Sequence, residues 1–408
     1  MNTQPTQPQK RIEILDVFRG FAILGIFVVN IEIMNCVFMN QDAYSAQWTA
    51  PIDIMSVRIF QLFFYSKFFP IFSFLFGLGI TMQALSLFEK NKLRFSFFAR
   101  RMLVLFVFGA LHVLLFWSGD VIHLYAVLGL LTTLLIKKSN RLILWLSLVF
   151  LLFPFYDQVA DYLFSITKYN PESYLKNFSS NDVIDTIRNG SYTNGVKLRT
   201  LEYLSNIPLL FVFLAPVALS MFLLGLYFGK NNFVTSIETL IDRIKKPSLI
   251  IAISTNLYRI IFLFFLPDFE IYSNEYARPI FLKLMFLSDI VMGLFYLWLV
   301  AWIWYKTKWK KIISPLKYVG RMALTNYIMQ SVIGLLLFSS IGFSLYETLS
   351  PSQTLITALI VFCFQLMYSK IWLTYFMYGP LEWVWRCFTY QKLLPIKKSP
   401  LRIKTQSQ

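Results

Sequence analysis

The stretch RIEILDVFRGFAILGIFVVNIEIMN, residues 11–35, is long and apolar enough to cross a lipid bilayer as a single helix. It nevertheless contains Asp16, Arg19, Asn30 and Glu32. Ionisable side chains are costly inside a membrane and usually face a polar interior or a functional site. This stretch therefore predicts a membrane helix and supplies the first candidate functional residues.

The composition extends this prediction to the whole chain. Of the 408 residues, 57% are hydrophobic and only 14% are charged, and apolar runs recur from Leu15 to Tyr378. We therefore predict an all-α polytopic membrane protein. The first run is expected to stay as the first helix, because no small-residue cleavage site follows it and many more apolar runs do.

Ten apolar runs predict ten transmembrane helices, at about residues 13–38, 67–88, 98–117, 121–137, 141–157, 207–228, 248–266, 282–305, 322–343 and 354–377. Basic clusters lie at both ends of the chain and in every second connection. By the positive-inside rule, both termini are expected in the cytoplasm of a bacterial plasma or inner membrane. The net charge of +17 follows from this topology, and we expect no nucleic-acid partner.

A long polar segment divides the chain. We predict an N-terminal five-span half at 1–157, an extracytoplasmic cap at 158–206, a C-terminal five-span half at 207–378 and a basic cytoplasmic tail at 379–408. Residues 52–66 are apolar but contain two charges, which is typical of an interfacial helix on the outer surface.

Helical periodicity gathers the polar groups of the first span. Asp16, Arg19 and Asn30 fall within an arc of roughly 60°, whereas Glu32 lies on the other side. Asp16 and Arg19 are three residues apart and are expected to pair. Arg19 is then either a neutralised positive-inside anchor or part of a polar groove. Asn30, about 16 Å further along the same face, favours the groove.

The chain has two histidines, and both are predicted near the outer end of neighbouring helices. A short turn separates His112 from His123, so that these two residues and Asp120 are expected to share a cavity. Asp120 has a second interpretation, as the N-cap of the following helix. The histidines are functional candidates because imidazole titrates near neutral pH.

The second half contributes further intramembrane polar residues. Asn326 and Gln330 share a helix face, which is consistent with helix–helix hydrogen bonds and equally with ligand contacts. For Arg259 and Asp289, a structural ion pair between neighbouring helices is slightly favoured over contacts with a substrate. The scattered Cys36, Cys363 and Cys387 show no ligand spacing, so no metal or bound cofactor is predicted.

Four motifs carry a resemblance to a known family: LDVFRGFAILGIFVVN at 15–30, GALHVLLFWSGDVIHLYAVLG at 109–129, GRMALTNYIMQS at 320–331 and GPLEWVWRCFTY at 379–390. They resemble the YeiB-like membrane proteins, domain of unknown function 418, over nearly the whole chain. More distantly, the chain is similar to transmembrane acyltransferases, including the lysosomal heparan-glucosaminide acetyltransferase and the acyltransferase-3 proteins.

This resemblance implies transfer of an acyl group from a cytoplasmic acyl-CoA co-substrate to an extracytoplasmic acceptor such as an envelope glycan. In acyltransferase-3 proteins an arginine on the first helix is followed, after ten residues, by a catalytic histidine, whereas Asn30 stands in that place after Arg19. His112 or His123 would then be the base, with Asp120 orienting it and Asn30 stabilising the oxyanion. Arg19 and Arg321 would hold the donor phosphates.

Two other classes of function stay open. A secondary transporter would use Asp16, Glu32, Asp120 and Asp289 with the histidines to move protons or bind a solute. A receptor or scaffold would use the 158–206 segment as its partner surface. The sequence leaves the oligomeric state undetermined.

Overall fold

The computed structural model describes residues 12–36, 40–89, 94–153 and 155–398, which form helices and short connections without a β-sheet. Seven helical segments of this part of the chain are long and apolar enough to cross a membrane: Glu13–Asn35 (α1), Pro51–Phe88 (α3 to α4), Phe95–Leu115 (α5), Ile207–Lys230 (α11 to α12), Lys245–Phe264 (α14), Ala277–Lys306 (α15) and Pro351–Tyr375 (α19). The protein is therefore a helical membrane protein, as its composition predicted.

Each of the ten predicted ranges contains a helix, but three of these helices are short or bent. Helix α6 (Ile122–Leu134) has 13 residues, about 20 Å by helical rise, whereas the hydrocarbon core is about 30 Å thick. Helix α7 (Asn140–Leu152) meets α8 (Tyr156–Thr167) at 78°, and the segment Lys310–Arg321 meets α18 (Ala323–Phe338) at 84°. Counting each bent pair as one span gives up to nine candidate spans in the described residues.

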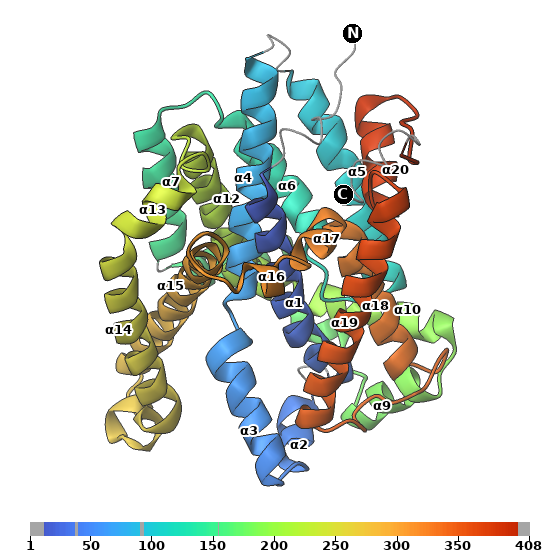
Figure 1. The fold of residues 1–408 in the computed structure, drawn as a ribbon. Coiled ribbons are helices and arrows are strands. Elements are labelled where there is room, and N and C mark those ends of the chain that lie inside the picture. Colours follow the sequence, from blue (N-terminus) through green and yellow to red (C-terminus); the bar gives the residue numbers. More distant parts are fainter. Residues whose placement is uncertain (1–11, 37–39, 90–93, 154, 399–408) are drawn as a thin grey trace.

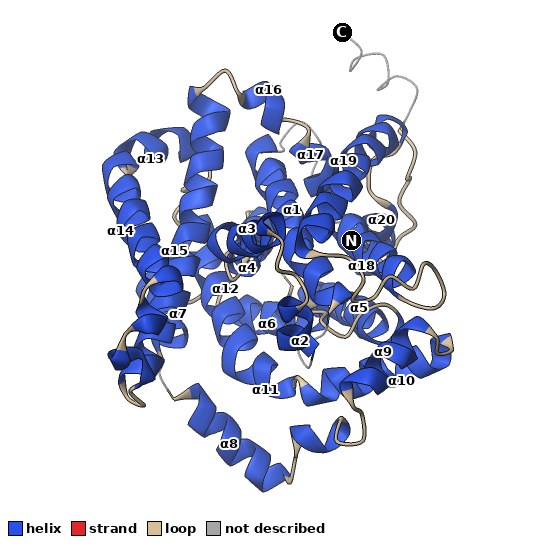
Figure 2. Cartoon of the chain, turned by 90° about the horizontal axis from the view of Figure 1, so that it is seen from below, coloured by secondary structure: helices blue, strands red, loops and turns tan. Residues whose placement is uncertain are grey.

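Shorter helices complete the fold: α2 (Gln41–Ala46), α3 (Pro51–Ile59), α9 (Ser180–Arg188), α10 (Tyr192–Ser205), α11 (Ile207–Leu209), α13 (Ile237–Arg243), α16 (Lys310–Ile313), α17 (Leu316–Arg321) and α20 (Pro380–Tyr390). Within the longer segments, α4 spans Phe68–Phe88 and α12 spans Ala215–Lys230. Figure 1 shows α20 toward the upper end of the molecule and α2, α3 and α9 at the lower end. Figure 2, seen from below, shows α8 projecting beyond the other helices.

Helix α1 lies in the middle of the bundle and contacts α4, α17, α18 and α19. Helix α4 in turn packs on α12. A Cβ atom on Gly77 would lie 2.3 Å from the Phe222 carbonyl oxygen, and one on Gly225 would lie 2.3 Å from that of Phe74. These glycines therefore allow the two helix backbones to touch, as small residues do in membrane helix pairs.

Two glycines also set the crossing of α1 and α17. A Cβ atom on Gly20 would lie 2.0 Å from the Leu316 carbonyl oxygen, and one on Gly320 would lie 1.8 Å from that of Asp16. No side chain fits at either position. This crossing brings Arg321, which follows Gly320, toward the helix that carries Asp16 and Arg19.

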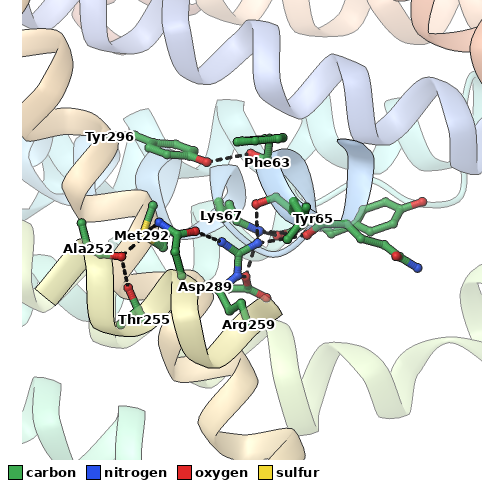
Figure 3. A network of polar contacts seen from close by, with 12 residues as sticks. Phe63, Tyr65, Lys67, Ala252, Thr255, Arg259, Asp289, Met292 and Tyr296 are labelled. Atoms are coloured by element: carbon green, nitrogen blue, oxygen red, sulfur yellow. Dashed lines mark hydrogen bonds and ion pairs between the residues drawn. The ribbon is translucent and has the colours of Figure 1, made fainter. Parts of the chain in front are cut away.

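Residues 52–66, predicted as one interfacial helix, form α3, a π-helical turn (Phe60–Phe64) and a sharp break at Ser66, whose φ is 60°. A buried ion cluster holds the break (Figure 3). Asp289 contacts Lys67 Nζ and Arg259 Nε, each at 2.8 Å. Arg259 donates to the carbonyl oxygens of Gln61 and Leu62, and Lys67 donates to that of Tyr65 at 2.8 Å. The predicted Arg259–Asp289 pair is present, with Lys67 as a third member.

Candidate functional site

One large cavity runs through the bundle beside α1. Its volume is about 1660 Å³, and its walls come from α1, α4, the turn between α5 and α6, α17, α18 and α20. Asp16, Arg19 and Asn30 line it, whereas Glu32 does not. By helical rise, Arg19 and Asn30 are about 16 Å apart along α1. Three of the four polar residues singled out in the first span thus line a cavity instead of facing lipid.

One end of the cavity is strongly basic. All of its lysine and arginine side chains belong to four helices and the segment after α20: Arg19, Arg101, Lys317, Arg321, Arg386, Lys392 and Lys398. The charges of Arg386 and Arg19 both act on Arg101, and Arg101 stacks on the Trp385 ring at 3.7 Å. Three carboxylates, Glu13, Asp16 and Glu382, lie at the same end, so basic charge is in excess. The arrangement suits a ligand with several negative charges.

Local contacts explain how the C-terminal segments reach this end. Glu382, in the first turn of α20, accepts hydrogen bonds from the backbone N–H groups of Leu324 (2.7 Å) and Thr325 (3.1 Å) and so caps the start of α18. This contact joins the GRMALTNYIMQS and GPLEWVWRCFTY motifs. It also fixes α20, which carries Arg386, against the helix that follows Arg321.

The second group of polar residues lies around the turn between α5 and α6. His112 Nδ1 is 2.8 Å from Asp120 Oδ1, although poorly aligned for a hydrogen bond, and His123 Nδ1 is 3.2 Å from Asp120 Oδ2. All three side chains are buried. A Cβ atom on Gly109 would lie 2.2 Å from the backbone nitrogen of His123, so a glycine at this position lets α6 approach α5. The structure therefore brings both histidines onto one carboxylate.

The position of Asp120 is compatible with both interpretations drawn from the sequence, as the N-cap of α6 and as a group of the cavity. Its Oδ2 accepts the backbone N–H groups of Ile122 at 2.8 Å and His123 at 3.4 Å, as a helix cap does. Burial opposes ionisation, but His112 and His123 lower the pKa of Asp120 below its ordinary value. Asp120 itself lines the cavity, whereas the two imidazoles lie behind it. Of these three residues, Asp120 is thus the one that lines the cavity.

Tyr203 of α10 completes the cluster and was missed by the sequence reasoning. Its hydroxyl lies 2.9 Å from His123 Nε2, and it lines the cavity beside Asp120. The two contacts of His123 fit the tautomer with its proton on Nδ1, in which Nε2 accepts from Tyr203. Tyr203 is 80 residues from His123 in sequence, and its own neighbourhood in the chain carries no pattern that points to this contact.

The other predicted residues are held elsewhere. Asn326 donates to Ser369 Oγ at 3.0 Å and Gln330 to Gln365 Oε1 at 2.9 Å, so both bond α18 to α19. Neither residue lines the large cavity, and neither do Arg259 and Asp289. In the described part of the chain, no group of three or more His, Cys, Asp or Glu residues is placed to hold a metal ion.

A family model described as "Protein of unknown function (DUF418)" matches residues 228–392. The chain is 29% identical to "Uncharacterized protein YxaH" of Bacillus subtilis over 97% of this chain and 98% of that one. It is 25% identical to "Uncharacterized protein YeiB" of Escherichia coli over 93% and 97% of the two chains. No solved structure matches the chain.

The class defined by the fold is a multi-helix membrane protein with a large cavity that several charged and polar residues line. The match to the DUF418 family model and the similarity to YxaH and YeiB along nearly the whole chain are those expected from the resemblance that the four motifs carry. The names of these relatives state no activity, and the similarity to transmembrane acyltransferases stays a prediction.

Proposed function

We propose that this protein is a membrane acyltransferase that moves an acyl group from a cytoplasmic acyl-CoA to an extracytoplasmic acceptor such as an envelope glycan. The observation that carries the proposal is the large cavity, which is basic at one end and is lined by Asp120 and Tyr203 elsewhere. A CoA thioester combines several phosphate charges with an apolar acyl chain. The basic end suits the phosphates, and the apolar wall between α1 and α4 suits the chain.

The proposed topology orients this cavity. We place the chain in the bacterial plasma or inner membrane with ten crossings and both termini in the cytoplasm, because basic and acidic connections alternate along the sequence. The basic end of the cavity then faces the cytoplasm, where acyl-CoA is made. The end near Asp120 faces outward, beneath the segment 158–206.

The proposed chemistry uses groups that line or adjoin the cavity. Arg19 and Arg321 hold the donor phosphates, and Arg101 and Arg386 add to their charge. The acceptor hydroxyl passes its proton through the Tyr203 hydroxyl to His123 Nε2, while Asp120 stabilises the imidazolium formed. The acceptor oxygen attacks the thioester carbonyl, and Asn30 donates to the oxyanion. The C–S bond then breaks, and CoA leaves as the thiol with the proton from His123.

Donor binding tests the first half of this proposal. Purified protein in nanodiscs is expected to bind acetyl-CoA, with roughly 10-fold or greater loss of affinity in Arg19→Ala and Arg321→Ala and weaker binding at high salt. Arg243→Ala is the matched control, because Arg243 is an exposed arginine of α13 outside the cavity. Transfer of the acetyl group to envelope glycans, followed with radiolabelled donor, tests the second half.

A secondary transporter is the second candidate, favoured by one observation. The break at Ser66, held by the buried charges of Lys67, Arg259 and Asp289, resembles the broken helices at which transporters bind solutes. Proton-driven uptake of a solute into liposomes, together with no binding of any CoA thioester, would select the transporter and exclude the acyltransferase.

A further inference from the structure

A second, smaller cavity lies next to the large one and has no part in the chemistry above. Its volume is about 80 Å³, and it lies between the end of α5, helix α10 and the second half of α18. Trp117 and Ser118 line both cavities. These two residues therefore form a wall that the two cavities share. Ser118 is two residues before Asp120 in sequence.

Three polar side chains of this small cavity each have one buried atom without a hydrogen-bond partner among the described residues. Glu202 is 8% exposed and Ser331 is 1% exposed. The atoms without a partner are Glu202 Oε1, Ser331 Oγ and Arg199 Nη2. Glu202 Oε2, by contrast, accepts from Ser118 Oγ at 2.8 Å. A buried polar atom without a partner costs about 1–3 kcal/mol, so the three atoms together indicate a bound polar group.

The charges of the small cavity restrict what it binds. Glu202 and Arg199 are its only charged lining residues in the described chain. An anion is disfavoured by Glu202 and a cation by Arg199, while an apolar group would leave the three atoms unpaired. A neutral group with hydroxyls satisfies all of them, because a hydroxyl both donates and accepts. The volume is several times the 10–15 Å³ that one water molecule requires.

We propose that the small cavity is a subsite for a neutral, polyhydroxylated ring, namely one sugar residue of the acceptor. Glu202 and Ser331 hold its hydroxyls, and the Trp117 and Tyr192 rings form apolar walls. A neighbouring sugar of the same acceptor then reaches Tyr203 and Asp120 past Ser118. The role of this subsite in holding the acceptor rests on the proposed acyl transfer. Binding of the sugar itself does not require the acyl-CoA donor. Water molecules share the hydroxyl chemistry, and the experiment separates them from a sugar.

Saturation-transfer NMR on the full-length protein in nanodiscs tests this proposal, with D-glucose and N-acetylglucosamine as probes and no acyl donor present. Saturable binding of at least one sugar is expected. Glu202→Gln is expected to weaken it roughly 10-fold and Ser331→Ala a few-fold, because each loses a hydrogen bond to the ring. Asp182→Asn is the matched control, since Asp182 is an exposed carboxylate of α9 in the same segment.

The absence of saturable binding of both sugars would mean that the cavity holds water only and would overturn the proposal. Unchanged affinity in both Glu202→Gln and Ser331→Ala would overturn it as well. If Glu202→Gln does not fold, the affinity of Ser331→Ala decides. Acetyl-CoA binding, measured on the same samples, separates the two proposals. Sugar binding without acetyl-CoA binding would exclude the acyltransferase, and acetyl-CoA binding without sugar binding would exclude the sugar subsite.

Discussion

At the scale of single residues, the site is made by contacts between distant parts of the chain. His112 and His123 are adjacent in the fold because a short turn and Gly109 bring α5 and α6 together. Tyr203 belongs to α10, and its hydroxyl lies 2.9 Å from His123 Nε2. The proton path proposed for acyl transfer depends on this last contact. Tyr203 also lines the large cavity.

Substitution of Tyr203 by Phe tests the path while keeping the ring. We expect the transfer rate to fall at least ~100-fold, the lower range of general acid–base contributions, with the acetyl-CoA affinity unchanged. Single-turnover rates and donor binding measured on the same protein separate the two quantities. Tyr162→Phe, at an exposed tyrosine of α8, is the control. An unaltered rate in Tyr203→Phe would rule out the relay through this hydroxyl.

Glu202 gives the protein a specific dependence on pH. Burial raises the pKa of Glu202 to about 7, against the opposing effects of Ser118 and Arg199, from an ordinary value of 4.5. The folded protein therefore holds this proton more tightly than the unfolded chain. The resulting stabilisation is complete below pH 4.5 and is lost as the pH rises through 7, a change on the order of 3 kcal/mol.

Thermal unfolding of wild type and Glu202→Gln across this pH range measures the effect. The difference in melting temperature between the two proteins is expected to change progressively between pH 4.5 and 7 and to be constant on either side, because glutamine does not titrate. Asp182→Asn, at an exposed position, controls for general changes in charge. A difference that is constant across the whole range would contradict the raised pKa.

At the scale of helices, glycine contacts decide which elements come close enough to build the cavity. The α1–α17 crossing depends on Gly20 and Gly320. The C-terminal motif then adds Arg386 through the cap that Glu382 forms on α18. Together these contacts assemble the basic end of the cavity from residues that are more than 300 positions apart in sequence.

Gly320→Ala is expected to force α17 away from α1, because its Cβ would lie 1.8 Å from the Asp16 carbonyl oxygen. The overpacking is expected to lower the free energy of unfolding by about 1–3 kcal/mol and to weaken acetyl-CoA binding by moving Arg321. Gly79→Ala is the control for stability, since the nearest atom is Arg19 Nη2 at 3.5 Å. Equal melting temperatures for the two variants would show that the crossing tolerates a side chain.

The buried cluster at the break before α4 is expected to be sensitive to loss of its anion. Asp289→Asn leaves Lys67 and Arg259 as two buried cations and is expected to cost about 3–5 kcal/mol. Asp242→Asn removes one of the two carboxylate partners of Lys306, in an exposed pair at 2.9 Å, and is expected to cost less than about 1 kcal/mol. Thermal unfolding in detergent compares the two. Similar losses would indicate that the cluster is solvated.

At the scale of the whole molecule, the remaining question is how the helices are placed in the bilayer. Among the residues that the structure describes, seven segments are long and apolar enough to cross it and two bent pairs extend the number to nine, while α6 is short. The ten crossings that we propose require α6 to cross as well. Tyr203 of α10 contacts His123 at the start of α6, so this end of the short helix is covered by protein instead of lipid. An even number keeps both termini on the same side.

Reporter fusions test this topology. A phosphatase fused after residue 408 is expected to be inactive and a fluorescent protein at the same site to be active, because the C-terminus is predicted in the cytoplasm. A phosphatase inserted at Asn194, in the exposed first turn of α10, is expected to be active. Activity in the opposite pattern would invert the orientation. Phosphatase activity at both sites would show an even number of crossings between residue 194 and the C-terminus, whereas five are predicted.

The sequence by itself determined the properties that depend on composition and on local periodicity. The apolar runs predicted a helical membrane protein, and the spacing of Asp16, Arg19 and Asn30 put them on one face of α1, because a helix repeats every 3.6 residues. The short turn around Asp120 was enough to predict that the two histidines are neighbours. Only the tertiary structure decided the contacts of Lys67, Glu202, Tyr203 and Glu382, since these join segments with no local pattern in common. The bends between α7 and α8 and before α18 also belong to the tertiary structure, because hydropathy does not record them.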